Sequence, residues 1–238
     1  MKIRPVAGAL AALLLAGCAG MPPELAEVLG SAAGSAQPLG EQEIAQGLKE
    51  ALAVGTERAV YRVGVVDGFW RNAQINIPLP EQLRKVEKAL RNFGQGAKVD
   101  EFHLSLNRAA EAAAPEAADI FATAIRGMTL ADARAILDGT DNAATEYFRG
   151  KTLPALTARF KPIVTKATAS VGATRKYKDL AAKVSKVSSS FQLQDLDAYV
   201  TERALAGLFV TLADEELKIR RDPAARTTEL LKRVFGSR

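Results

Sequence analysis

The sequence VDEFHLSLNRAAEAAA, residues 99–114, decides the fold class of this chain. Apolar residues recur in it at every third or fourth position: Val99, Phe102, Leu106, Ala109 and Ala113. That spacing places them on one face of an α-helix. The alanines raise helix propensity and shorten the distance between packed helices, because their side chains are small. The run therefore predicts a helix buried in a bundle.

The same helical period continues on both sides of this run. Towards the N-terminus it is carried by Ile44, Leu48, Ala51, Leu52 and Val60. No segment alternates in the way a half-buried strand would. From residue 41 to the end we therefore predict an all-α fold, a compact multi-helix bundle of roughly eight to ten helices.

Capping and breaking residues set the expected helix limits. Thr129 and Asp132 form a capping box before a helix at 130–137, which Gly139 ends. Asp195 is the expected N-cap of the longest helix, from 196 to about 221.

Three further limits are predicted in the same way. Pro80 begins a helix that runs to Phe93, and Pro115 opens the next one. A last helix is predicted at 228–235.

The first residues predict an exported, lipid-anchored protein. Lys2 and Arg4 precede an apolar stretch at 6–16, which has the length of a signal-peptide core and is too short to span a bilayer. Residues 15–18, LAGC, resemble the lipobox of bacterial lipoproteins, in which the cysteine is acylated and becomes the mature N-terminus.

This leader divides the chain into three expected parts. Residues 1–17 are the signal peptide, 18–40 the lipidated N-terminus with a Gly/Ser/Ala/Pro-rich flexible tether, and 41–238 a single helical domain. Ala19 stands where an aspartate would resemble an inner-membrane retention signal. We therefore expect anchoring through Cys18 in the cell envelope, at the outer membrane and facing the periplasm.

Composition excludes several classes of function. The chain has 238 residues, 48% hydrophobic and 25% charged, enough for one packed core. Its formal charge of +5 falls to +3 once Lys2 and Arg4 are removed, and the remaining basic residues are mixed with acidic ones. That mixture is typical of solvated helix faces, and we expect no nucleic-acid partner.

Cofactor and metal sites are not expected either. Cys18 is the single cysteine, so its acylation leaves no thiol for disulfides, metal binding or nucleophilic catalysis. Residues 138–142, DGTDN, do not have calcium-loop spacing, and a helix stop at Gly139 with Thr140 or Asp141 as the next N-cap explains them. No phosphate loop, dinucleotide fingerprint or serine elbow is present.

Motifs spread along the chain resemble those of a bacterial family. They are GLKEAL (47–52), DGF (67–69), IPLP (77–80), LR (83–84), NRAAE (107–111), DNAATEYFR (141–149), FKP (160–162), DAYVT (197–201), EE (215–216) and IR (219–220). In this order they look like the domain-of-unknown-function 4197 family, over about residues 43–236. The resemblance implies an exported or lipid-anchored all-helical domain whose biochemical role is not established.

Eight polar residues on three predicted helices form a candidate interhelical cluster: Asn107, Arg108, Glu111, Asp141, Thr145, Tyr147, Glu215 and Arg220. Charged groups beside alanine-rich faces are costly to bury unless they are paired. We therefore expect at least two of these helices to turn the cluster towards a shared groove. Two interpretations are open, a structural network or the lining of a binding cleft.

Two smaller patterns involve members of the cluster and their neighbours. Arg108 with Glu111 and Glu216 with Arg220 have the spacing of helical ion pairs. His103, Asn107 and Glu111 share one face, where we expect hydrogen bonds to a neighbouring helix rather than a metal site.

An apolar stretch that has neither helical nor strand period lies between the first two helices. It contains Phe69, Trp70, Ile77 and Leu79, together with Ile75. These side chains either fold back over the core and close one end of the bundle, or form a contact patch for a partner.

Two classes of function remain. The favoured one is a non-catalytic binding or structural module at the periplasmic face of a membrane, with an envelope protein, a glycan or an apolar ligand as partner. The alternative is a hydrolase that uses carboxylates and Tyr147 in an interhelical cleft.

Overall fold

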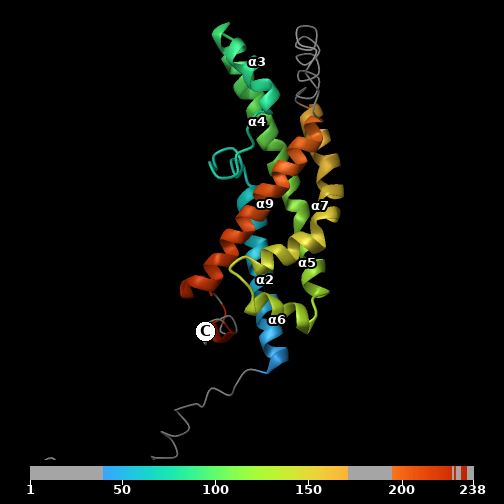
Figure 1. The fold of residues 1–238 in the computed structure, drawn as a ribbon. Coiled ribbons are helices and arrows are strands. Elements are labelled where there is room, and N and C mark those ends of the chain that lie inside the picture. The colour runs from blue at the N-terminus through green and yellow to red at the C-terminus, as the bar shows by residue number, and fades with distance from the viewer. Residues whose placement is uncertain (1–39, 171–194, 227, 229–231, 235–238) are drawn as a thin grey trace, which may run out of the picture. The chain divides into compact units, whose positions relative to one another are not determined.

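The computed structural model describes residues 40–170, 195–226, 228 and 232–234, and within them it holds only helices and connecting segments (Figure 1). The helices are α2 (Glu41–Gly64), α3 (Glu81–Asn92), α4 (Gly96–Ala113), η1 (Ala114–Glu116), α5 (Ala117–Arg126), α6 (Leu130–Asp138), α7 (Ala143–Ser170), α9 (Leu196–Arg221) and η2 (Pro223–Ala225), where η marks a 3₁₀ helix. The predicted all-α fold and helix count are confirmed. The predicted leader, nearly all of the tether and half of the 228–235 helix lie outside the described residues.

The capping residues act as the sequence predicts. The Thr129 hydroxyl accepts from the N–H of Asp132 at 3.1 Å, and the Asp132 carboxylate accepts from the N–H of Thr129 at 3.0 Å. The Asp195 carboxylate accepts from the N–H groups of Asp197 and Ala198, the second and third residues of its helix. These bonds satisfy donors that have no partner within their own helix, so α6 and α9 begin where predicted. Pro115 lies in η1, and α5 begins at Ala117.

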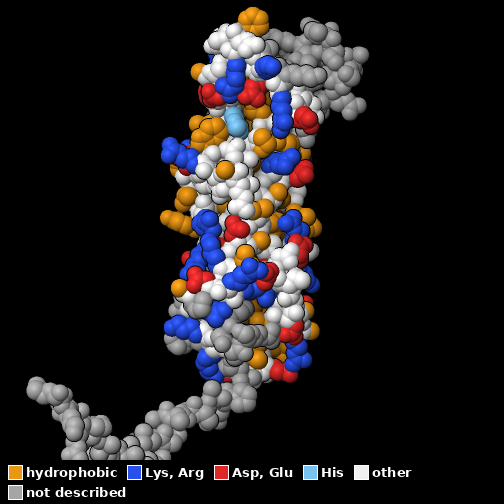
Figure 2. Space-filling view, turned by 60° about the vertical axis from the view of Figure 1, so that its left-hand side comes forward, with side chains coloured by type: hydrophobic (Ala, Val, Ile, Leu, Met, Phe, Trp, Pro, Cys, Tyr) orange, Lys and Arg blue, Asp and Glu red, His pale blue; other side chains and the backbone are white. Residues whose placement is uncertain are grey.

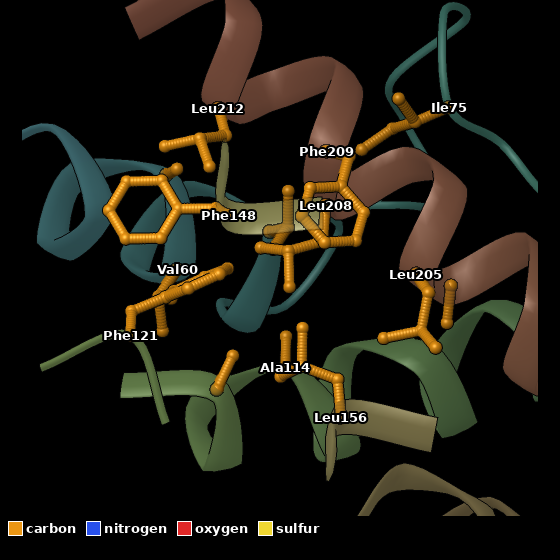
Figure 3. Close-up of a cluster of buried hydrophobic side chains, with 14 of the residues drawn as sticks. Val60, Ile75, Ala114, Phe121, Phe148, Leu156, Leu205, Leu208, Phe209 and Leu212 are labelled. Carbon is orange, nitrogen blue, oxygen red and sulfur yellow. The ribbon is translucent and has the colours of Figure 1, made fainter. Parts of the chain in front are cut away.

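The core is formed by α2, α4, α5, α7 and α9. Its centre is aromatic: Phe121, Phe148 and Phe209 come from three different helices and are fully or almost fully buried (Figure 3). The Phe121 ring meets those of Phe148 and Phe209 edge-on, at centroid distances of 5.2 and 6.2 Å. Edge-to-face pairs of this kind add to the hydrophobic stabilisation of α5 against α7 and α9.

The segment 65–80 between α2 and α3, called here the 65–80 loop, belongs to this core. Phe69, Ile75, Ile77 and Leu79 are all buried. Phe69 and Ile75 pack against the middle of α9, where a Cβ placed on Gly207 would lie 2.6 Å from the Phe69 ring and 3.1 Å from Ile75. The prediction that the loop folds back over the core is confirmed. The expectation that it closes one end of the bundle is wrong, because Gly207 receives it half-way along α9 (Figure 1).

The surface is charged without a dominant sign on the face that Figure 2 shows. Lys and Arg side chains lie interspersed with Asp and Glu side chains over this face. None of the described helices combines the length and apolar character that a membrane span requires.

Candidate functional site

The polar face of α4 holds the backbone of the 65–80 loop. The Asn107 side chain accepts from the N–H of Ile77 at 2.8 Å and donates to its carbonyl at 3.1 Å. One oxygen of Glu111 accepts from the N–H groups of Phe69 and Trp70, at 3.0 and 3.1 Å. Asn107 and Glu111 are both buried, and they supply the partners that an irregular buried backbone requires.

Arg108 ties the start of the loop to Glu111. Its guanidinium donates to Glu111 at 2.5 Å and to Asp67 at 2.6 Å. Asp67 has a φ of 70°, in the left-handed region, where a residue other than glycine needs support from its surroundings. The hydrogen bond to Glu111, followed by the one to Asp67, raises the pKa of Arg108. The predicted ion pair between Arg108 and Glu111 is confirmed.

His103 completes this contact on the side of Trp70. Its Nε2 lies 2.8 Å from the carbonyl of Ile77 and 3.2 Å from Oδ1 of Asn76, and both are acceptors. The N–H group at Nε2 therefore donates a hydrogen bond to the loop. The Trp70 ring stands edge-on to the imidazole, with centroids 4.9 Å apart. The expectation that this face of α4 binds a neighbouring helix is wrong, since its partner is the loop.

A second polar group joins α9 to the start of α7. The Glu216 carboxylate accepts from the N–H groups of Ala144 and Thr145, each at 2.9 Å, and from the Thr145 hydroxyl at 2.8 Å. Arg220 donates to Glu216 and to the carbonyl of Ile136, at 2.9 and 2.8 Å. The predicted pair of Glu216 and Arg220 is confirmed.

The N-terminus of α7 is thus capped by another helix. The prediction that Thr140 or Asp141 caps it is wrong, because Glu216 binds these N–H groups instead. A buried carboxylate there is also favoured by the helix dipole. Asp141 pairs with Arg221 on the surface.

A third group links α9 to α2. Glu215 is buried and accepts from Arg62 at 2.6 Å and from Lys218 at 2.8 Å. Burial by itself would raise the pKa of this carboxyl. The hydrogen bonds from Lys218 and Arg62 outweigh burial, so the pKa of Glu215 lies below its usual value.

The eight predicted residues therefore divide into separate structural groups. Asn107, Arg108 and Glu111 hold the loop, Thr145 and Arg220 meet at Glu216, and Glu215 binds Arg62. Each ionisable member has a partner on another element, which fits a structural network. Among the described residues no group of three or more His, Cys, Asp and Glu side chains is placed to hold a metal ion.

The sequence reasoning missed Arg62 and Asp67 as partners, and it found Glu216 as the partner of Arg220 but not of Thr145. Asp67 carried a signal, since it lies within a motif quoted above. Arg62 carried none, because its pairing depends on how α2 and α9 cross.

Tyr147 lines a cleft between α5 and α7, called here the Tyr147 cleft, of about 440 Å³. The cleft also contains Asp119, Lys151 and Arg159. The Tyr147 hydroxyl points to the carbonyl of Ala124 at 3.4 Å, and burial, helped by the charge of Asp132, raises its pKa. Of the carboxylates named with it as candidates, Glu111, Asp141 and Glu215 do not line this cleft.

An apolar hollow on the described surface lies between α2 and α5, and we call it the α2–α5 groove. It has a volume of about 600 Å³. Small and apolar side chains dominate its lining: Ala53, Thr56, Glu57, Val60, Tyr61, Gly64, Val65, Pro115, Ala118, Ala122, Ile125 and Arg126. A volume of this size is within the range of ligand-binding sites.

Exposed apolar side chains gather at one end of the groove. Tyr61 is 71% exposed, Val66 75% and Val65 36%, and Tyr61 and Val65 are both in the lining. Isolated apolar residues are common on surfaces, but a cluster beside an apolar hollow marks a contact site. The predicted contact loop has the opposite character, since Phe69, Ile77 and Leu79 are buried.

Fold and site together define an all-helical bundle domain with an apolar surface groove and a loop locked by buried polar side chains. A comparison with family models matches residues 38–236 to a protein family of unknown function, DUF4197. The chain belongs to that family. No curated protein and no solved structure matches it.

Proposed function

We propose that this protein is a lipid-anchored protein of the bacterial envelope, and that its helical domain is a non-catalytic binding or structural module acting through the α2–α5 groove. The observation that carries the proposal is the groove itself, an open apolar surface with Tyr61 and Val66 exposed beside it. Apolar surface in water is unfavourable, so a partner that covers it gains affinity.

The anchor rests on the first residues. Two basic residues, a short apolar stretch and the sequence LAGC at 15–18 are the features of a bacterial lipoprotein leader. A protein held at the membrane surface through Cys18 would present its groove to other envelope components. The partner classes considered for the groove are an envelope protein, a glycan and an apolar ligand.

The arrangement of the carboxylates favours binding over hydrolysis. A hydrolase that uses general acid and base needs carboxylates facing one substrate. Glu111 is occupied by two backbone N–H groups and Arg108, and Glu215 by Arg62 and Lys218. Among the residues that line the Tyr147 cleft, the side-chain carboxylate is that of Asp119.

The anchor is tested by replacing its cysteine. Cys18→Ala should prevent normal processing and acylation, so the variant should keep its leader and carry no acyl group. Cell fractionation and intact-mass measurement of the mature protein provide the readout. Wild-type protein that is fully soluble and carries no acyl group would refute the anchor.

The groove is tested by photo-cross-linking in intact cells. A photoreactive amino acid in place of Tyr61 should form an adduct of defined mass. The matched control places the same amino acid at Leu130, an exposed apolar position on α6 that is not in the groove lining. Equal yields at the two positions, or no adduct at 61, would rule out the groove as a binding site.

A further inference from the structure

We propose that the partner of the α2–α5 groove is a second copy of this chain, related to the first by a two-fold axis that runs along the groove. The inference rests on the proposed binding function of the groove and names its partner. It follows from the shape of the surface, from its charges and from the direction of α2.

The first argument is self-complementarity. A two-fold interface uses the same patch on both copies, so the patch must contain both a projection and a hollow that receives it. Tyr61 projects from α2 and is 71% exposed, whereas Ala118 and Ala122 on α5 leave room. An axis along the groove places α2 of one copy over α5 of the other, which brings Tyr61 onto this alanine surface.

The second argument is the run of the two helices. Gly64, at the end of α2, lies against Pro115, since a Cβ placed on Gly64 would be 3.3 Å from that ring. At the other end Glu41 pairs with Arg134 of α6, the helix that follows α5. The two helices are therefore antiparallel (Figure 1). Glu57, seven residues before Gly64, and Arg126, eleven residues after Pro115, line opposite walls of the groove away from its Gly64–Pro115 end.

The third argument is charge. Within the part of the chain that the structure describes, neither Glu57 nor Arg126 takes part in an ion pair, although both line the groove. The two-fold axis sets Glu57 of each copy opposite Arg126 of the other, so the interface contains two such pairs. Opposite charges facing across an interface select the partner and fix its register.

The direction of α2 agrees with the anchor. A rotation about an axis parallel to α2 leaves both α2 helices pointing the same way. The Gly40 ends of the two copies then face the same side, which suits two chains held by one membrane. An axis perpendicular to the groove would point these ends in opposite directions.

The experiment combines the cross-linker at Tyr61 with charge reversal, in intact cells and in the full chain. The adduct should have twice the mass of the chain. Glu57→Arg alone and Arg126→Glu alone should each lower its yield several-fold, because each sets like charges opposite one another. The double variant E57R/R126E should restore the yield to near the wild-type level.

The control is Glu202→Arg, an exposed position on α9 outside the groove, which should leave the yield unchanged. Glu57 and Arg126 are exposed, so the reversals should not unfold the chain, and thermal unfolding checks this. An adduct of a different mass would refute the second copy while keeping the groove as a binding site. No adduct at all would refute both proposals, and a double variant that stays weak would refute the two-fold arrangement.

Discussion

Most apolar side chains of the 65–80 loop are buried, whereas apolar side chains at the rim of the α2–α5 groove are exposed. In the loop, Phe69 is 0% exposed, whereas Tyr61 on the rim of the groove is 71% exposed. The loop can be buried because Asn107 and Glu111 supply partners for its backbone N–H and C=O groups. Hydrophobicity alone therefore does not decide whether an irregular segment enters the core. The polar side chains that meet its backbone decide it as well.

The largest expected effect comes from removing one aromatic ring from each region. Phe69→Ala should lower the free energy of unfolding by about 3–5 kcal/mol, because it removes a fully buried ring and leaves a cavity. Tyr61→Ala, the matched change in the groove, should alter it by less than about 0.5 kcal/mol. Urea unfolding followed by circular dichroism measures both. Similar losses for the two variants would show that the groove is covered in the isolated chain.

A smaller effect is expected from the polar partner of the loop. Asn107→Leu keeps the size of the side chain but leaves the N–H and carbonyl of Ile77 without that partner, which should cost about 2–3 kcal/mol. Asn92→Leu, at the exposed end of α3, is the control and should be close to neutral. If Asn107→Leu were as stable as wild type, the apolar side chains of the loop alone would be enough to hold it in place.

The close approach of the loop to α9 predicts opposite signs for two glycine substitutions. Gly207→Ala should destabilise the fold by about 1–2 kcal/mol, because its Cβ would lie 2.6 Å from the Phe69 ring and 3.1 Å from Ile75. Gly150→Ala, in α7, meets no atom within 4 Å and should stabilise the fold by about 0.5–1 kcal/mol. Thermal unfolding of both variants gives the comparison, and a loss of stability in both would refute it.

The smallest expected effect is on the pH dependence of stability. It concerns α2, which lines the groove on one side and contacts α9 on the other. The pKa of Glu215 is lowered in the folded chain, so its carboxylate adds stability above the pKa of the unfolded state, and this stability is lost as the pH falls through the folded value. Glu215→Gln should therefore make stability less dependent on pH below the usual carboxyl range, about 4–5.

A second variant gives the opposite test of the same pair. Arg62→Met removes one of the donors that lower the pKa of Glu215, so acid unfolding should begin at a higher pH than in wild type. Stability curves measured between pH 3 and 7, about the range in which carboxyl groups titrate, provide the readout. If stability fell with decreasing pH in both variants as it does in wild type, the role assigned to Glu215 would be contradicted.

The helices were predictable because their signals are local. The capping box at Thr129 and the N-cap at Asp195 need only neighbours in sequence, and both were found where expected. The loop partners were predictable as residues but not as contacts, since Asn107 meets a segment 30 residues away. The groove could not be predicted, because Ala118 and Ala122 have the composition of a helix-packing face and only the crossing of α2 and α5 leaves them open.

Glu216 has a consequence for the order in which the chain folds. The first turn of α7 takes its cap from a residue 71 positions later in the chain. During synthesis that carboxylate follows α7 in the chain, so before α9 is in place the amide groups of Ala144 and Thr145 must rely on water. The start of α7 is therefore finished only when α9 docks. Docking of α9 therefore adds its core side chains and the cap of α7 together.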